Sequence, residues 1–286
     1  MFTKEKRYYI YLLMIILLLG TGCGKSVEAV NMSSGDIAAI DGNELLYITD
    51  IDLATEYTEP KHVDLSQMDE ALFIEKGGEY VLSGNSTQAI TIDTHDEQVH
   101  LFLDNVNVET VVGPAINIQS AGKVVITLPE GTMNTLFDAA YYKDDNLDAA
   151  IMATCDLTLN GPGTLYVCGY YKDAIHTKDV FKVLGSELQL KAKRYGIRAN
   201  DGMVLEPEYL LIESEKNGCQ TTNANKEGKG IIDVRGGEIS IVSGQYALSS
   251  VADVYIREGI VYLNSVVADI YTEGQQYIAE GVLADE

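Results

Sequence analysis

Acidic and amide side chains recur at matching positions of this 286-residue chain, and their spacing could build a calcium site. Asp179, Asp201 and Asn223 follow one another at intervals of 22 residues, and Asp173 lies six residues before the first of them. If each interval is one coil of stacked strands, equivalent residues lie about 4.8 Å apart. Such a row supplies the oxygen ligands that Ca²⁺ prefers. The sequence therefore predicts calcium at Asp173, Asp179, Asp201 and Asn223, the alternative being that these residues only cap turns.

Tyrosines outside the apolar positions form a second candidate set. A Tyr ring can stack on a sugar while its hydroxyl stays in water. The alternative for each single tyrosine is that its ring only packs against its neighbours at the edge of the fold. The sequence predicts a carbohydrate-binding surface from Tyr141, Tyr142, Tyr170, Tyr171, Tyr195 and Tyr246.

The charge of the chain restricts its partners. It has 43 acidic and 20 basic residues, a net charge of −23. Nucleic-acid binding is excluded, because it requires clustered Lys and Arg. An acidic polysaccharide would be repelled unless cations bridge it to the protein, whereas a neutral glucan needs no bridge.

An internal repeat must position these candidates. Ile175, Ile197, Cys219, Leu248 and Ile270 are spaced by 22, 22, 29 and 22 residues. Further apolar residues alternate with polar ones, which is the period of a strand, and recur in phase. Phe181, Val183, Leu188 and Leu190 return 22 residues later as Met203, Leu205, Leu210 and Ile212. Coils of this kind bury their apolar faces only by stacking.

The predicted fold is all-β: a single-stranded right-handed parallel β-helix, a solenoid with coils of about 22 residues. The hand follows from the rule for parallel crossovers. The sequence lacks the consensus of a leucine-rich repeat, and the blades of a β-propeller are longer than these repeats. Two longer steps contain insertions, 137–148 and 223–230, which we expect as loops that both project from one corner of the solenoid.

The N-terminal residues resemble an export signal. Lys4, Lys6 and Arg7 precede an apolar run and small residues before Cys23. This pattern predicts a lipoprotein signal peptide over 1–22, lipidation of Cys23 and membrane anchoring on the extracytoplasmic face of a bacterial cell. An uncleaved anchor is the alternative, although an apolar core of about 10–12 residues is short against the ~20 needed to span a bilayer. Residues 23–60 are predicted as linker and N-terminal cap, and 61–286 as the β-helix.

Three further cysteines lie within the predicted β-helix. Cys155, Cys168 and Cys219 are an odd number, so at least one of them is unpaired outside the cell. Their spacing fits no zinc motif. We expect small buried side chains, with one disulfide possible among them.

Several segments resemble a family of bacterial carbohydrate-binding β-helix proteins that are related in architecture to polysaccharide lyases. The resemblance covers about residues 70–264 and rests on runs that read GEYVLSG (78–84), LDNV (103–106), GPAI (113–116), KVVITLPEGTMNTL (123–136) and DAIHTKD (173–179). It implies binding of cellulose-like or acidic plant polysaccharides, with calcium bound by the β-helix. The family pattern implies Asp where this chain has Tyr195 and Tyr246, which would exchange an ion site for a stacking surface.

The predicted function is calcium-assisted polysaccharide binding without catalysis. A calcium-dependent polyuronate lyase is one alternative, with Arg194, Arg198, Lys172 or Lys178 near the face. Neighbouring carboxylates would keep such a base protonated. A structural surface protein or adhesin with a protein partner is the other alternative. The last coil ends soon after Ile270, so an open edge there predicts self-association.

Overall fold

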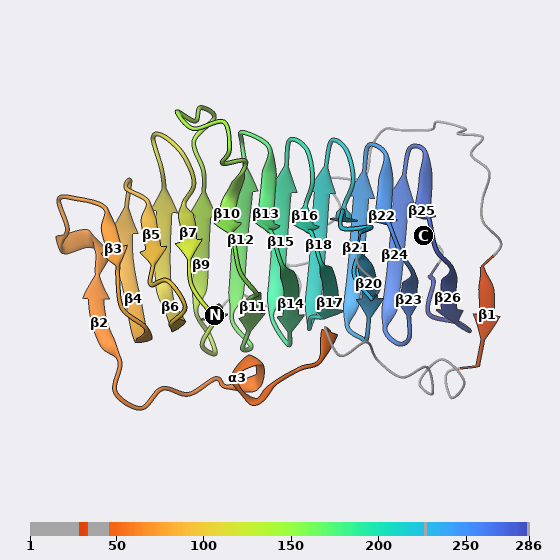
Figure 1. Cartoon of the computed structure of the whole chain (residues 1–286), viewed down its shortest axis with the longest axis horizontal. Coiled ribbons are helices and arrows are strands. Elements are labelled where there is room, and N and C mark those ends of the chain that lie inside the picture. The colour runs from red at the N-terminus through yellow and green to blue at the C-terminus, as the bar shows by residue number, and fades with distance from the viewer. Residues whose placement is uncertain (1–28, 34–45, 226–227, 285–286) are drawn as a thin grey trace, which may run out of the picture.

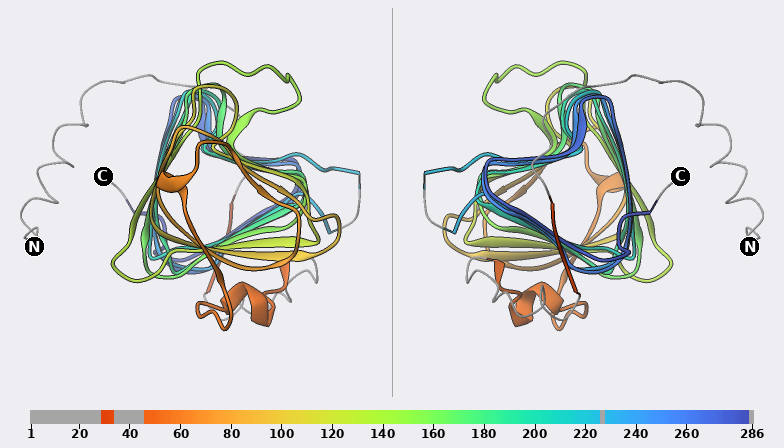
Figure 2. Two further views of the ribbon diagram at one scale, coloured as in Figure 1. Left: turned by 90° about the vertical axis from the view of Figure 1, so that its left-hand side faces the viewer. Right: turned by 90° about the vertical axis from the view of Figure 1, so that its right-hand side faces the viewer.

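The computed structural model describes residues 29–33, 46–225 and 228–284, which form a parallel β solenoid of triangular cross-section (Figures 1 and 2). The predicted signal peptide and Cys23 lie outside the described residues. Strands dominate these ranges, which confirms the all-β prediction. Two short helical elements are α3 (Asp50–Leu53) and the 3-10 turn η2 (Leu65–Gln67).

Each coil contributes one strand to each of three faces. The first face contains β2 (Lys61–Asp64), β4 (Gly78–Ser86), β6 (Gln98–Glu109), β8 (Lys123–Thr127), β11 (Leu157–Asn160), β14 (Val180–Leu184), β17 (Gly202–Glu206), β20 (Ile231–Val234), β23 (Val254–Ile256), β26 (Gln276–Ala279) and β1 (Val30–Met32).

The second face begins with the ends of the long strands β4 and β6, since β6 pairs with strands of both faces. It continues through β9 (Met133–Phe137), β12 (Thr164–Gly169), β15 (Glu187–Ala192), β18 (Tyr209–Ser214), β21 (Glu238–Ser243) and β24 (Ile260–Ser265). The third face contains β3 (Leu72–Ile74), β5 (Ile90–Asp93), β7 (Ile116–Ser120), β10 (Ala149–Ala153), β13 (Asp173–Thr177), β16 (Ile197–Ala199), β19 (Cys219–Thr221), β22 (Tyr246–Ser250) and β25 (Ala268–Thr272).

The strand register confirms the predicted apolar columns. Ile175 pairs with Ile197, then Cys219, Leu248 and Ile270 follow in the third face. Phe181, Met203, Ile232 and Val254 are equivalent in the first face. Most of these side chains have no exposed surface and join one continuous core. The chain therefore buries its apolar residues by stacking coils, as the repeat requires.

Two corners of the triangle matter for the site. The turns that join the second face to the third, at 170–172, 193–196, 215–218, 244–245 and 266–267, form what we call the aromatic corner. The turns that join the third face to the first, at 154–156, 178–179, 200–201, 222–230 and 251–253, form the acidic corner. Both longer connections are loops, as predicted, but they lie at two different corners and not at one, because the first joins β9 to β10 and the second joins β19 to β20. The loop before β10 projects beside the aromatic corner (light green in Figure 2) and the connection before β20 projects at the acidic corner.

The segment before β2 crosses the outside of the first face (α3 in Figure 1). We call residues 46–60 the strap. Arg235 donates a hydrogen bond to the carbonyl oxygen of Leu46, and Asn160 donates to the carbonyl oxygens of Asp52 and Ala54. The backbone amides of Thr58 and Glu59 donate to Glu79. Part of the region that the sequence assigns to linker and cap is thus bound along the solenoid.

The last coil is partly covered by the chain itself. Strand β1 pairs in parallel with β26, and Val261 of β24 forms a bridge with Leu283. In the third face, β25 pairs with β22 and no described strand pairs with its other edge. The open edge expected from the sequence is therefore reduced to one of the three terminal strands.

Cys155, Cys168 and Cys219 are all buried and all carry free thiols. No disulfide joins them, because Cys155 lies at the turn before β11, Cys168 in the second face and Cys219 in the third face. Burial raises the pKa of Cys155 to about 12, which makes its thiol unreactive.

Candidate functional site

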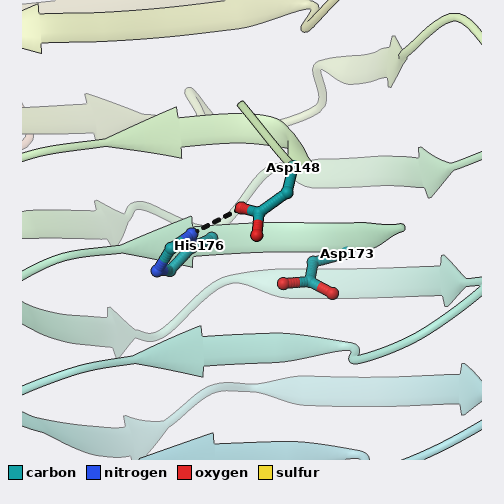
Figure 3. Close-up of side chains that lie close together, drawn as sticks. All are labelled: Asp148, Asp173 and His176. Carbon is teal, nitrogen blue, oxygen red and sulfur yellow. Dashed lines mark hydrogen bonds and ion pairs between the residues drawn. The ribbon is translucent and has the colours of Figure 1, made fainter. Parts of the chain in front are cut away.

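The start of β13 carries a compact polar cluster. Asp148, Asp173 and His176 lie together on the outside of the third face (Figure 3), and one ligand atom of each falls within 4.8 Å of the others. The Asp148 Oδ1 and His176 Nδ1 atoms are 2.7 Å apart. Asp173 is fully buried, and the Nε2 atom of His176 is buried without a hydrogen bond.

Two arginines bind the carboxylates of this cluster. Arg194 donates from Nε to Asp173 Oδ1 at 2.6 Å and from Nη2 to Asp173 Oδ2 and Asp148 Oδ2, each at 2.7 Å. Arg198 places Nε 3.1 Å from Asp173 Oδ2 and donates from Nη2 to Asp148. Two carboxylates and two guanidinium groups balance in charge. A divalent cation on the same oxygens would lie against two fixed positive charges, so these residues do not fit a metal site.

Two glycines allow the tight turns that bring the residues of the cluster together. A Cβ atom at Gly169 would collide with the carbonyl oxygen of Asp173, so the chain can turn tightly before β13 only with glycine there. Gly196 follows Tyr195 and faces inward, where a Cβ would collide with Ile212. Because Gly196 takes the inward position, its neighbour Tyr195 lies at the surface.

The charged groups of the cluster stabilise one another. Burial alone would raise the pKa of Asp148, but the hydrogen bond with His176 and the charge of Arg198 outweigh it and hold that pKa well below its usual range. Burial raises the pKa of Asp173, and the two arginines oppose that shift. Burial would lower the pKa of Arg194, yet Asp173 and Asp148 raise it overall. Arg194 therefore stays protonated and makes a poor general base.

A second buried acid supports the tyrosines of the aromatic corner. Asp138 accepts hydrogen bonds from the hydroxyl of Tyr142 at 2.8 Å and from the backbone amide of Tyr170 at 2.5 Å. Burial raises the pKa of Asp138 to about 6. The ring of Tyr142 is only 4% exposed and stacks on Tyr171, with centroids 4.4 Å apart. Tyr142 thus supports the ring of Tyr171 and does not present its own ring to solvent.

The other predicted tyrosines do reach the surface. Tyr141 is 64% exposed and Tyr170 46% exposed, while Tyr171, Tyr195 and Tyr246 are half-buried. Tyr195 lies beneath the guanidinium carbon of Arg194, 4.9 Å from its ring centroid. Tyr246 stacks on Tyr271 of the next coil at 5.0 Å. The rings therefore follow the aromatic corner over several coils.

Tyr271 was missed in the sequence although a signal was present. It follows Ile270, the last residue of the apolar column, and alternation along a strand directs that neighbour outward. It pairs with Ser249, and its side chain is 42% exposed.

The structure divides the predicted metal ligands. Asp173 lies at the aromatic corner in the arginine cluster, whereas Asp179, Asp201 and Asn223 lie at the acidic corner, at the other end of the third face. There, Asn223 Nδ2 donates to Asp201 Oδ1 at 2.5 Å, and the Lys229 ammonium forms an ion pair with Asp201. Burial and the charge of Asp156 raise the pKa of Asp179. Asp156, which the predicted set left out, therefore belongs to this group.

Fold and site together define the class of protein. It is a parallel β solenoid with aromatic and charged residues gathered on the outside of one corner. A structure of a polysaccharide lyase-like protein from C. thermocellum, a gadolinium derivative, matches with a TM-score of 0.74 and 28% identity. The match covers 79% of this chain and 99% of that chain.

The chain belongs to the family of carbohydrate-binding domain-containing proteins, whose model matches residues 68–286. A relative described as a carbohydrate-binding domain-containing protein from Acetivibrio thermocellus is 29% identical over 274 residues, which is 92% of each chain. The expected resemblance to carbohydrate-binding proteins is thus confirmed at the level of the family.

Among the described residues, no helix has the length and apolar character needed to cross a bilayer.

Proposed function

We propose that this protein is a right-handed solenoid that binds polysaccharide along the aromatic corner, without catalysis. The observation that carries the proposal is a set of tyrosine rings at the aromatic corner on four of five consecutive coils: Tyr171, Tyr195, Tyr246 and Tyr271. Tyr195 and Tyr246 are two coils apart, about 10 Å at the usual strand spacing. Rings spread over several coils suit an extended glycan better than a small ligand.

Replacing Tyr195 or Tyr246 with alanine is expected to weaken binding to a neutral β-glucan roughly 3- to 10-fold each, since an aromatic contact contributes about 0.5–1.5 kcal/mol beyond its buried area. Affinity electrophoresis through gels containing the glucan measures the effect. Tyr262→Ala is a matched control, because this half-buried tyrosine lies on β24 in the second face. Equal retardation of all the variants would instead favour the adhesin with a protein partner.

The chemistry of the aromatic corner supports a binding protein over a lyase. Arg194 is held protonated by two carboxylates, and Asp138, the acid with a pKa near 6, lies buried beneath Tyr142. A general base must reach the proton it removes. Neither group meets that requirement in this arrangement, so lyase activity is not part of the proposal.

Calcium is proposed at the acidic corner. Asp156, Asp179 and Asp201 supply carboxylates there, and Asn223 adds an amide oxygen, which are ligands suited to Ca²⁺. The support is the mutual repulsion of Asp156 and Asp179, which raises the pKa of Asp179 in addition to burial. When bound, the ion would neutralise this repulsion. Lys229 already contributes one positive charge at Asp201.

Replacing Lys229 with alanine is therefore expected to tighten calcium binding about 10-fold, because an ammonium no longer competes for Asp201. Isothermal titration calorimetry with CaCl₂ measures the dissociation constants. Lys178→Ala is the control, since Lys178 is exposed and forms no described ion pair with Asp201. An unchanged or weaker affinity in Lys229→Ala would contradict a calcium site at Asp201.

A lipid anchor at Cys23 is proposed on the sequence pattern alone. In the bacterial cell, Cys23→Ser is expected to move the protein from the membrane fraction to the soluble fraction, because the thiol that carries the lipid is lost. Cell fractionation and immunoblotting measure this change, with Cys219→Ala as a control outside the signal. An unaltered distribution of Cys23→Ser would point to the uncleaved anchor.

Self-association through the last coil remains a prediction, and one residue of that coil opposes it. At the position before the apolar column, earlier coils have Ala150, Ala174, Gly196, Gly218 and Ala247, whereas β25 has the carboxylate of Asp269. A charge at this place on an edge strand opposes pairing with another strand.

A further inference from the structure

Three basic residues lie one above another at the aromatic corner. The backbone amide of Arg194 donates to the carbonyl oxygen of Lys172 at 2.8 Å, and the amide of Lys216 donates to that of Arg194 at 3.0 Å. These bonds place Lys172, Arg194 and Lys216 at the same position of three successive coils. Their backbones are therefore spaced at about 4.8 Å. We call them the basic row.

The hydrogen bonds to the buried acids do not use every donor of the arginines, so some donors can still bind a ligand. Arg194 donates hydrogen bonds to Asp148 and Asp173 through Nε and Nη2. Arg198 donates to Asp148 through Nη2, and its Nε forms an ion pair with Asp173 at 3.1 Å. No hydrogen bond to a described residue uses Nη1 of either guanidinium, and the side chains remain 22% and 17% exposed. The two arginines are thus fixed in orientation with donors left for a ligand. Lys172 is half-buried and Lys216 exposed.

Within the turns of the aromatic corner, acids are fewer than cations. Asp148 and Asp173 are paired with the arginines, and Glu213 lies 3.7 Å from Lys191. Glu215 is exposed beside Lys216, and Lys193 is exposed on the preceding coil. Within the turns of the aromatic corner, four cations stand against one acid, Glu215: Lys172, Lys193, Arg194 and Lys216. The loop beside the corner adds Lys143, Asp144 and Asp145. The turns themselves therefore carry an excess of positive charge on a chain whose net charge is −23. Such a local reversal of charge favours an anionic ligand.

The first two cations of the basic row, Lys172 and Arg194, also lie against aromatic rings. The Lys172 ammonium is 4.4 Å from the ring centroid of Tyr171, and the Arg194 guanidinium 4.9 Å from that of Tyr195. A sugar with a carboxylate offers both complementary features, an apolar ring face and a negative charge. Beyond Lys216 the row continues as Gln245 and Val267, so the cations end there while the rings continue at Tyr246 and Tyr271.

We propose that the basic row binds the carboxylates of an acidic polysaccharide directly, with its sugar rings against Tyr171 and Tyr195, and that this binding needs no calcium. This inference rests on the proposed function and specifies the substrate class of its site. It replaces the expectation that an acidic chain must use bridging cations to bind a polyanion.

The test measures binding of polygalacturonate, its methyl ester and a neutral β-glucan to the full-length chain in non-ionic detergent with EDTA. Wild-type protein is expected to bind polygalacturonate in EDTA more tightly than the methyl ester. Lys172→Ala/Lys216→Ala is expected to lose at least 10-fold in affinity for polygalacturonate, with a weaker dependence on salt, and to keep its affinity for the methyl ester. Circular dichroism confirms that the variants fold.

Lys76→Ala/Lys178→Ala is the matched control, because it removes the same charge from two exposed lysines elsewhere. An equal loss in this control, wild-type affinity in Lys172→Ala/Lys216→Ala, or binding only with calcium would each overturn the inference. Retention of β-glucan binding alone would also overturn it while leaving the proposed function intact. Failure to bind all three glycans would overturn both.

Discussion

Replacing Asp52 with alanine is expected to reduce the free energy of unfolding by about 3–5 kcal/mol, the usual cost of removing one partner of a buried ion pair. Asp52 has no exposed surface, and its carboxylate lies 2.5 Å from the Lys123 ammonium and 3.0 Å from that of Lys182. Thr158 donates a further hydrogen bond at 2.5 Å. Without the carboxylate, two almost fully buried ammonium groups face each other uncompensated.

Thermal unfolding by circular dichroism measures this loss, and a fall in Tm of about 10 °C is expected for a domain of this size. Asp50→Ala is the matched control, because Asp50 is exposed on the same helix α3. A triple variant, Asp52→Leu with Lys123→Met and Lys182→Met, is expected to regain most of the stability, since apolar groups can replace a buried charge cluster. Equal Tm values for Asp52→Ala and Asp50→Ala would show that the strap contributes little.

The same carboxylate predicts how stability depends on pH. Burial alone would raise the pKa of Asp52, but the hydrogen bonds of Lys123, Thr158 and Thr49 outweigh it and hold the pKa well below its usual range. The contribution of Asp52 to stability is therefore complete above the unfolded-state pKa of about 3.9 and is lost as pH falls below it. The difference in Tm between wild type and Asp52→Ala should shrink on acidification below pH 4.

Asp173→Ala is expected to have the second largest effect, a loss of about 3 kcal/mol, because it leaves Arg194 and Arg198 with Asp148 as their remaining carboxylate. Asp173 is fully buried and contacts both guanidinium groups. It also accepts the backbone amide of Tyr195 at 3.3 Å. Loss of this side chain should therefore release both the basic row and the ring beside it.

Two measurements separate this role from that of a metal ligand. Guanidinium denaturation gives the stability, and affinity electrophoresis gives glycan binding, with the exposed loop residue Asp145→Ala as a control for both. Asp173→Asn keeps the shape and one acceptor oxygen, so it should lose less stability than Asp173→Ala. If Asp173→Ala instead abolished a stabilisation of the wild type by added Ca²⁺, Asp173 would be a calcium ligand, as the sequence pattern suggests.

The solenoid was predictable from particular residues. Ile175, Ile197, Cys219, Leu248 and Ile270 must face inward because burial of apolar side chains is the main favourable term in folding. Once they are aligned, the coil length and the coils that carry the inserted loops follow. Even the uneven step of 29 residues between Cys219 and Leu248 is preserved as direct strand pairing.

The candidate site was predictable only in part. Tyr195 and Tyr246 were assigned to the surface by their place beside the apolar column, and they lie there. Tyr142 could not be distinguished from Tyr141, because an insertion has no repeat to align it, and only Tyr141 is exposed. Asp173 and Asp179 looked like one set because both belong to the repeat. They lie at opposite ends of β13, whose five residues separate them by one face of the triangle.

The sequence by itself determined the fold, the register of its coils and the family, since inward-facing residues must repeat with the strand and the coil. Only the tertiary structure decided how the polar side chains pair. Lys182 donates a hydrogen bond to Asp52, which lies 130 residues earlier in the sequence, and Arg194 donates to Asp148, 46 residues earlier. An outward-facing charged side chain can be hydrated or can pair with another charge. The sequence around it looks the same in both cases, so the sequence alone does not distinguish them. Whether it builds a metal site, a bound strap or a basic row depends on which charges the coils place side by side.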